Sequence, residues 1–187
     1  PDSQRLVYTS QRHDFYDLYV YDLQTGQEHL LARLGCDLDQ PYWSPDGKLL
    51  VCTINRKGAC DLLLVEVESG KTHDLRTAGG FHANPQWSPD GKSITFEYDN
   101  PVTPADIYLI EIDSNQVTQL TFSMPPALDA LPMVQPEAIE FHSLDGLEIP
   151  ALLYKPLPDQ PANQGRPGLR AGIVYPHGGP TAQHALE

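Results

Sequence analysis

A short stretch near the C-terminus, His177-Gly178-Gly179-Pro180, has the residue types and spacing best suited to chemistry in this sequence. Gly178 and Gly179 have no side chains, so their backbone N–H groups can come close to a ligand. Backbone N–H groups that converge on one point form an oxyanion hole, which stabilises the negatively charged oxygen of the tetrahedral intermediate in acyl transfer. The sequence therefore predicts that Gly178 and Gly179 supply part of such a hole.

Acyl transfer also needs a nucleophile, and the sequence contains no Gly-x-Ser-x-Gly motif, in which hydrolases of the α/β type carry their serine. No serine, aspartate and histidine of this chain can be assigned to a catalytic triad. We therefore expect the chain to be inactive by itself, because it holds only part of the machinery.

The elements that must position this stretch begin at residue 123. Residues 123–137 are rich in proline and show no alternation, which is typical of a linker. A hairpin with an Asp-Gly tip is expected at 138–154, because apolar and polar residues alternate on both sides of the tip. After a proline- and glycine-rich loop at 155–170, residues 171–175 are predicted to form a buried strand that leads directly into His177.

The first two thirds of the chain are organised around a repeated hexapeptide, Trp-Ser-Pro-Asp-Gly-Lys, which occupies residues 43–48 and again 87–92. The copies are 44 residues apart, and self-similarity at such a period is the signature of a repeat architecture. Within the hexapeptide, proline presets φ, aspartate tolerates the third turn position and glycine accepts a left-handed conformation at the fourth. It is therefore predicted to close a hairpin, and its tryptophan to be a blade-packing residue rather than a platform for a ligand.

A second type of segment repeats in step with the hexapeptide, at residues 17–23, 61–67 and 106–112. Each copy begins with aspartate, for which we expect a structural role in bonding the backbone of the neighbouring repeat. Each then runs through β-favouring, mostly apolar positions, the pattern of a strand covered on both faces. The turns that follow place Gly26, Gly70 and Asn115 at equivalent positions, and these residue types accept a positive φ.

Residues 1–122 are therefore predicted to form a partial β-propeller of about three four-stranded blades, so the fold class is mainly β. The chain begins in the middle of a repeat and ends on Leu-Glu, a pair that often precedes a purification tag. We interpret it as a piece cut from a longer protein. Because an open stack of blades leaves apolar faces and strand edges uncovered, we expect this piece to self-associate.

Composition excludes several classes of function. The formal charge of −13 and the lack of clustered Lys or Arg argue against a nucleic-acid partner. The longest aliphatic run, residues 62–65, is far too short to cross a membrane. Cys36, Cys52 and Cys60 are odd in number and lack the spacing of a metal site, so buried thiols in a reducing, cytoplasmic compartment are favoured over a disulfide. No cofactor and no metal are predicted, and the remaining histidines are scattered.

Taken together, the repeats, the linker, the hairpin and the His-Gly-Gly-Pro stretch resemble the prolyl oligopeptidase family of serine peptidases, in its acylaminoacyl-peptidase and dipeptidyl-peptidase-like branch. In that family a propeller with Trp-Ser-Pro-Asp-Gly phrases precedes a C-terminal α/β-hydrolase domain. Pro136-Glu137, Asp145-Gly146 and Ile149 match the start of that domain. The resemblance implies that residues 138–187 are the first strands of a truncated α/β-hydrolase domain.

The resemblance also implies a substrate and a role for each residue of the motif. The propeller would restrict access so that only short peptides reach the serine, and Gly179, with Gly178, would stabilise the tetrahedral intermediate of peptide hydrolysis. His177 stands where some relatives have a tyrosine that donates to the oxyanion, which makes it the third candidate. Two alternatives stay open: a non-catalytic TolB-like propeller that binds protein partners through its loops, and an esterase, since the same oxyanion junction serves ester hydrolysis.

Overall fold

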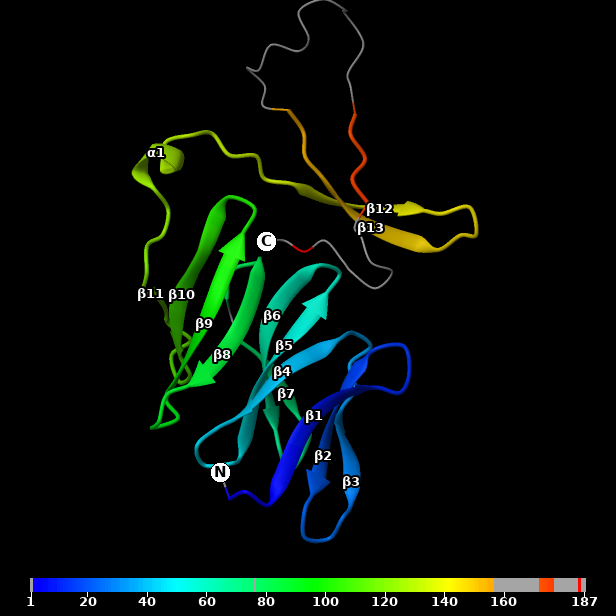
Figure 1. Ribbon diagram of the computed structural model, residues 1–187, viewed down its shortest axis with the longest axis vertical. Coiled ribbons are helices and arrows are strands. Elements are labelled where there is room, and N and C mark those ends of the chain that lie inside the picture. Colours follow the sequence, from blue (N-terminus) through cyan, green and yellow to red (C-terminus); the bar gives the residue numbers. More distant parts are fainter. Residues whose placement is uncertain (1, 76, 157–171, 177–184, 186–187) are drawn as a thin grey trace, which may run out of the picture. The chain divides into compact units, whose positions relative to one another are not determined.

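The computed structural model describes residues 2–75, 77–156, 172–176 and 185, which divide into two compact units (Figure 1). The first unit comprises the residues up to Pro125 together with Ala185, and the second begins at Pro126. The structure is mainly β, and the described part of the chain contains no helix that is long and apolar enough to cross a bilayer.

The repeated hexapeptide folds into the same turn in both copies, as predicted. In the first copy the Ser44 hydroxyl donates to Asp46 Oδ1 (2.7 Å), the Lys48 N–H donates to the same oxygen (3.1 Å), and Gly47 has a φ of 71°. The second copy repeats these bonds and gives Gly91 a φ of 70°. Serine and aspartate thus satisfy backbone and side-chain groups within the turn, so its shape depends on local sequence.

The first repeat forms a three-stranded antiparallel sheet in the order β1-β2-β3, with β1 at Arg5–Gln11, β2 at Tyr16–Asp22 and β3 at Glu28–Ala32. The sequence predicts four strands for each repeat, and three are present here among the residues that the structure describes.

The second and third repeats each have the four strands that were expected of a blade. These are β4 (Leu38–Trp43), β5 (Leu49–Arg56), β6 (Ala59–Glu66) and β7 (Thr72–Asp74), then β8 (Phe81–Trp87), β9 (Ser93–Asn100), β10 (Thr103–Glu111) and β11 (Val117–Gln119). Gly26, Gly70 and Asn115 turn the chain with φ values of 68°, 69° and 54°, as predicted. One parallel pair, Cys60 with Phe81, joins β6 to β8 and links the two repeats into one sheet.

The first strands of these two repeats, β4 and β8, carry the same irregularity. Register shifts interrupt β4 between Asp39 and Tyr42 and β8 between Ala83 and Gln86. Within the shifts, Gln40 and Asn84 have φ values of 50° and 51°, although neither is glycine. The Asn84 N–H donates to Gln40 Oε1 (2.6 Å), so the two irregularities are bonded to each other across the repeats.

The hydrophobic core lies between consecutive repeats. One cluster fills the space between the first and second repeats, with Trp43 packed against it: Leu18, Val20, Leu31, Ala32, Leu38, Leu50, Cys52, Ile54, Leu63, Val65 and Val67. The other fills the space between the second and third repeats, with Trp87 packed against it: Val51, Leu62, Leu64, Leu75, Ile94, Phe96, Tyr98 and Ile110. Both faces of β6 are therefore buried, which explains its continuous apolar run and confirms the prediction for the second copy. The third copy differs, because most residues of β10 are only partly buried.

The second unit contains one turn of helix, α1 (Pro126–Asp129), and a hairpin of β12 (Glu137–His142) and β13 (Glu148–Leu153). The hairpin and its Asp-Gly tip agree with the prediction, and Gly146 has a φ of 86°. At the tip the Ser143 hydroxyl bonds Asp145 Oδ1, and the Leu147 N–H donates to Ser143 Oγ (3.1 Å). This is the serine–aspartate turn of the repeats, used again outside them.

Candidate functional site

The predicted oxyanion residues His177, Gly178 and Gly179 lie outside the described residues, so they remain a prediction. The segment that leads to them is described from Gly172 to Pro176, and it differs from expectation. It has no regular secondary structure, and Ile173, Val174 and Tyr175 are 94%, 91% and 79% exposed. The prediction of a buried strand is therefore wrong for this structure. A strand of that kind needs pairing partners and covering layers, and among the residues described in the second unit the one sheet is the β12–β13 hairpin.

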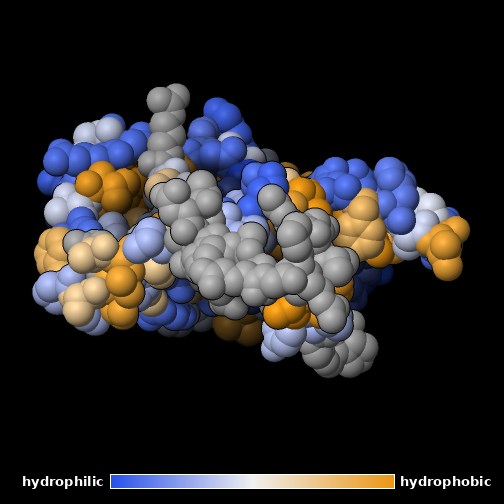
Figure 2. All heavy atoms as spheres, turned by 90° about the horizontal axis from the view of Figure 1, so that it is seen from above, coloured by the Kyte–Doolittle hydropathy of each residue, from blue (hydrophilic) through white to orange (hydrophobic). Residues whose placement is uncertain are grey.

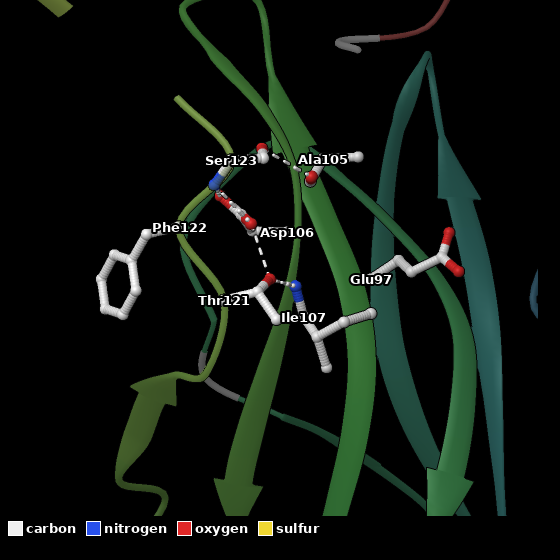
Figure 3. A pocket seen from close by; sticks show the side chains of 7 residues that line it. All are labelled: Glu97, Ala105, Asp106, Ile107, Thr121, Phe122 and Ser123. Carbon is white, nitrogen blue, oxygen red and sulfur yellow. Dashed lines mark hydrogen bonds between the residues drawn. The ribbon is translucent and has the colours of Figure 1, made fainter. Parts of the chain in front are cut away.

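A hollow of about 400 Å³ lies on the third repeat, beside the start of β10 (Figure 3). Its lining comes from two neighbouring segments and β9, namely Glu97, Ala105, Asp106, Ile107, Thr121, Phe122 and Ser123. Asp106 is buried beneath it and accepts hydrogen bonds from Thr121 Oγ1 (2.6 Å), the Ser123 N–H (3.0 Å) and Gln119 Nε2 (3.2 Å). These donors, the Thr121 hydroxyl first, lower the pKa of Asp106. The carboxylate is thus fully engaged in holding the segment after β11 and is poorly placed to act as a base.

The recurring aspartates have the structural role that was expected, but with different partners. Asp17 pairs with Arg33 (2.8 Å), Asp61 with Arg56 (3.2 Å) and Asp106 with the bonds given above, so each bonds a group of its own repeat. The expectation that they bond the backbone of the neighbouring repeat is therefore incorrect. The three aspartates lie on β2, β6 and β10, and their partners lie in the same repeat or directly after it.

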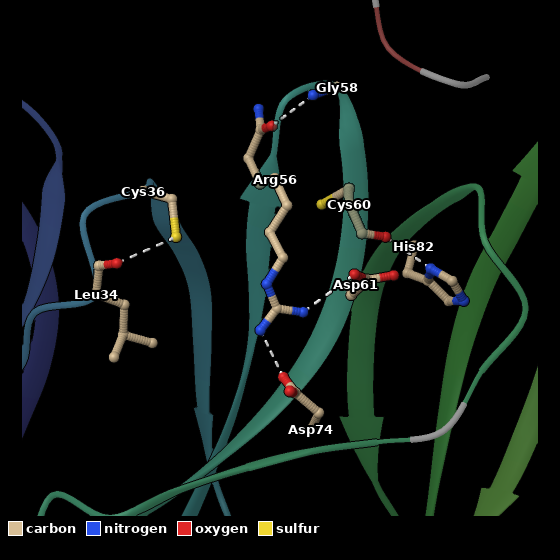
Figure 4. A network of polar contacts seen from close by, with 9 residues as sticks. Leu34, Cys36, Arg56, Gly58, Cys60, Asp61, Asp74 and His82 are labelled. Carbon is tan, nitrogen blue, oxygen red and sulfur yellow. Dashed lines mark hydrogen bonds and ion pairs between the residues drawn. The ribbon is translucent and has the colours of Figure 1, made fainter. Parts of the chain in front are cut away.

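A polar network surrounds Arg56 at the end of β5 (Figure 4). The guanidinium bonds Asp74 Oδ1 (2.6 Å) and Asp61 Oδ2 (3.2 Å), and these contacts, Asp74 first, raise the pKa of Arg56. The network is partly exposed, so it ties β7 to the β5–β6 hairpin rather than forming an enclosed charged site. Sequence reasoning did not find this network, because the three residues have no recognisable spacing.

His82 is a buried ionisable residue beside this network (Figure 4). Its Nδ1 lies 2.6 Å from the carbonyl oxygen of Cys60, and because a carbonyl can only accept, Nδ1 carries the proton. The centroid of its ring lies 5.4 Å from that of Phe96 and 4.8 Å from that of Tyr98. Its Nε2 has no hydrogen-bond partner within the described ranges. Burial lowers the pKa of His82, which keeps the ring neutral. A signal for this burial existed, since His82 lies 44 residues after Leu38, a core position of the preceding repeat.

The described residues offer hydrogen-bond chemistry for holding repeats together and little for catalysis. No three His, Cys, Asp or Glu side chains of this part are grouped so that they could hold a metal ion. Cys36, Cys52 and Cys60 are free thiols; the last two are buried, and burial raises the pKa of Cys52 to about 12. Buried thiols are poor nucleophiles, which agrees with the prediction of inert buried cysteines for Cys52 and Cys60, whereas Cys36 is only partly buried.

Comparison with known proteins supports the propeller interpretation. Residues 1–141 match the family model of the TolB beta propeller domain. No curated protein matches the chain. Among solved structures, TolB from Acinetobacter baumannii has a TM-score of 0.58 at 24% identity, over 83% of this chain and 36% of that protein.

Peptidases are also among the similar structures. A puromycin-hydrolysing peptidase of Mycobacterium tuberculosis has a TM-score of 0.72 at 18% identity, over 88% of this chain and 26% of that one. Dipeptidyl peptidase 4 of Porphyromonas gingivalis has a TM-score of 0.68 at 16% identity, over 84% and 23%. At these identities the likeness shows the fold, and the chain spans about a quarter to a third of the length of these proteins.

Proposed function

Because the chain belongs to the TolB beta propeller domain family, we propose that it is the propeller and the adjoining segment of a serine-type oligopeptidase that hydrolyses short peptides. In this proposal the blades are residues 1–122, the linker is 123–137, and 138–187 begin an α/β-hydrolase domain. The nucleophile, its base and the acidic residue of the triad then come from residues beyond Glu187 in the parent protein.

One observation carries the proposal: a β-hairpin and the sequence His177-Gly178-Gly179-Pro180 follow the repeats in the same chain. A propeller that only binds partners has no use for either feature. The likeness of the fold to a puromycin-hydrolysing peptidase and to a dipeptidyl peptidase agrees with this assignment. In the proposed mechanism the N–H of Gly179, assisted by Gly178, stabilises the tetrahedral intermediate, and His177 donates to the same oxygen.

A binding function is the second candidate, since TolB itself is among the similar structures. It differs from the first in a way that can be tested. Under this alternative the blades present loops to a protein partner, and the His-Gly-Gly-Pro stretch is only a turn.

The decisive experiment is fluorophosphonate labelling of the parent protein, with this chain as the control, followed by peptide mapping. The proposal expects a labelled serine beyond position 187 and no label on the chain alone. A folded parent that takes no label would refute the enzyme and support the binding propeller. A panel of peptide and ester substrates then separates a peptidase from an esterase of the same fold.

The oxyanion assignment needs a second test, which measures the activity of the unlabelled parent protein. Gly179→Pro removes the backbone N–H, whereas Gly179→Ala keeps it, so the two variants form a matched pair. Loss of one oxyanion donor lowers kcat by about 10²–10³. Equal activity of the proline and alanine variants would show that this N–H has no part in the reaction.

A further inference from the structure

Among the aspartates, glutamates, lysines, arginines and histidines that the structure describes, three are buried: Asp17, His82 and Asp106. Figure 2 shows hydrophilic residues spread over the surface of the molecule, where water solvates them. The two buried aspartates accept hydrogen bonds from side chains, Asp17 from Arg33 and Asp106 from Thr121. The His82 ring differs, because its Nε2 has no partner within the described ranges. His82 is therefore the one of the three whose side-chain hydrogen bonding is incomplete.

His82 lies where hydrogen bonds to backbone groups join the second repeat to the third. The Cys60 N–H donates to the carbonyl oxygen of Gly80 (3.0 Å), and His82 Nδ1 donates to that of Cys60 (2.6 Å). The hydroxyl of Tyr98, on β9, donates to the carbonyl oxygen of Gly79 (2.9 Å). These three bonds, which we call the junction latch, hold the chain at the start of β8 between β6 and β9.

The junction latch is closely packed. A Cβ at Gly80 would lie 2.5 Å from the carbonyl oxygen of Asp99, so no side chain fits there. Side chains alternate along β6, and Cys60 is therefore on the same face as Leu62 and Leu64, which pack against the third repeat. Cys60 is 7% exposed with the latch closed, and opening of the latch would expose its thiol.

The junction between the first and second repeats is built without an ionisable ring. Tyr16, which lies 44 residues before Cys60, donates its N–H to Asp37 Oδ1 (2.8 Å). Leu38, which lies 44 residues before His82, is fully buried in the apolar cluster of that junction. Leucine thus fills this position in one junction, so burial by itself does not require a histidine. The imidazole of the other junction adds a group that titrates near neutral pH.

The titratable and charged groups around the His82 ring come from three strands: Cys60 and Asp61 of β6, Tyr98 and Asp99 of β9, and Arg56 of β5. Arg56 bonds Asp61 (3.2 Å), as Figure 4 shows, so the negative charge of that carboxylate is partly compensated. Burial is the largest effect and lowers the pKa of His82, although the Cys60 carbonyl and Asp61 act in the opposite direction. A proton on Nε2 would place a charged donor where the described residues offer it no acceptor.

We propose that His82 is a pH-sensitive latch between the second and third repeats, and that uptake of one proton from the solvent at Nε2 opens the junction and exposes Cys60. Both ring nitrogens of the protonated form are donors. Nδ1 can keep the Cys60 carbonyl, whereas Nε2 finds an acceptor only in water, so protonation favours the open form. The bond from Asn84 to Gln40 does not involve this ring, and the opening is therefore local to the start of β8.

Accessibility of the Cys60 thiol measures the opening. A pyridyl disulfide reacts with a thiolate to form a mixed disulfide and releases a pyridinethiolate, and mass spectrometry follows this reaction at each cysteine. The rate in the native chain, divided by the rate in the urea-unfolded chain at the same pH, gives the open fraction. For Cys60 this ratio should rise by up to tenfold per pH unit below about pH 6.5. It should exceed the ratio for Cys52, which packs toward the first repeat.

Substitutions assign the effect to the ring. His82→Gln keeps a donor for the Cys60 carbonyl but does not titrate, so it should remove the pH dependence of the Cys60 ratio. His142→Gln, on the exposed strand β12, is the matched control and should keep it. Circular dichroism checks that each variant is folded. If His82→Gln is not folded, His82→Leu introduces the residue type of the equivalent position in the second repeat and is held to the same expectation.

Three results would overturn the proposal. The first is a Cys60 ratio that does not change between about pH 7.5 and about pH 5.5, the range in which an ordinary histidine titrates. The second is an equal ratio for Cys60 and Cys52 at every pH, which would mean that the repeats unfold together. The third is a rise that persists in the folded variants of His82.

Discussion

The indole Nε1 of Trp87 donates a hydrogen bond to the backbone carbonyl of Tyr42 across 3.1 Å. The tryptophan of one hexapeptide is therefore bonded to the first strand of the preceding repeat, β4. Together with the bond between Asn84 and Gln40, it joins the first strands of the second and third repeats, β4 and β8, to each other. The hexapeptide thus has two roles. Its turn is held by hydrogen bonds within the hexapeptide, whereas the tryptophan of the second copy connects two repeats.

Replacing Trp87 by phenylalanine should remove this connection while keeping an aromatic ring. The expected loss in the free energy of unfolding is about 1 kcal/mol, the usual net value of one hydrogen bond. Urea denaturation measures it. Tyr42→Phe is the matched control, because the acceptor is a backbone carbonyl and survives the change. An equal loss in the two variants would mean that the hydrogen bond contributes nothing.

Gly70 and Gly35 provide a test of close packing between repeats. Both have positive φ (69° and 72°), but a Cβ at Gly70 would lie 2.5 Å from the carbonyl oxygen of Leu31, whereas a Cβ at Gly35 would meet nothing within 4 Å. Gly35→Ala should cost about 1–2 kcal/mol for the left-handed conformation alone. Gly70→Ala should cost about 1–3 kcal/mol more, because backbone must move to make room. Thermal unfolding measures the loss of stability in each variant. Equal losses would mean that the backbone around Leu31 moves away from the added Cβ without cost.

His82 should make the stability of the first unit depend on pH. Burial lowers its pKa in the folded chain below the ordinary value of 6.5, so as the pH falls the unfolded chain takes up the proton first. The stability that His82 contributes is therefore complete above about pH 6.5 and is lost as the pH falls toward the folded pKa. Urea titrations between about pH 7.5 and about pH 5.5 should show a slope of at most about 1.4 kcal/mol per pH unit.

The assignment of this slope to His82 can be checked by substitution. His82→Phe should abolish most of it, whereas His142→Gln, on the exposed strand β12, should retain it. A slope that is unchanged in His82→Phe would show that another group is responsible.

The three cysteines should differ in reactivity. The thiolate is the reactive form, and burial holds the pKa of Cys52 near 12, whereas Cys36 is only half-buried. Brief alkylation of the native chain followed by mass spectrometry should modify Cys36 first and leave Cys52 intact, while the unfolded chain should react at all three. Early modification of Cys52 would mean that the repeats open readily.

The sequence by itself determined the features that depend on neighbours along the chain. The turns at Gly47 and Gly91, the positive φ at Asn115 and the Asp-Gly hairpin were all predictable, because each is set by the steric limits and side-chain acceptors of a few consecutive residues. The period of 44 residues predicted the repeats for the same reason, because it is the distance at which these local units recur.

Tertiary structure alone decided the features that depend on what packs nearby. The partners of Asp17 and Asp106 and the network around Arg56 join residues that are distant in sequence, and no local pattern specifies which donor lies closest. Ile173 and its neighbours also show that local sequence does not decide burial. Their apolar character predicts a buried strand, but burial requires other elements to cover them, and in this structure they are exposed.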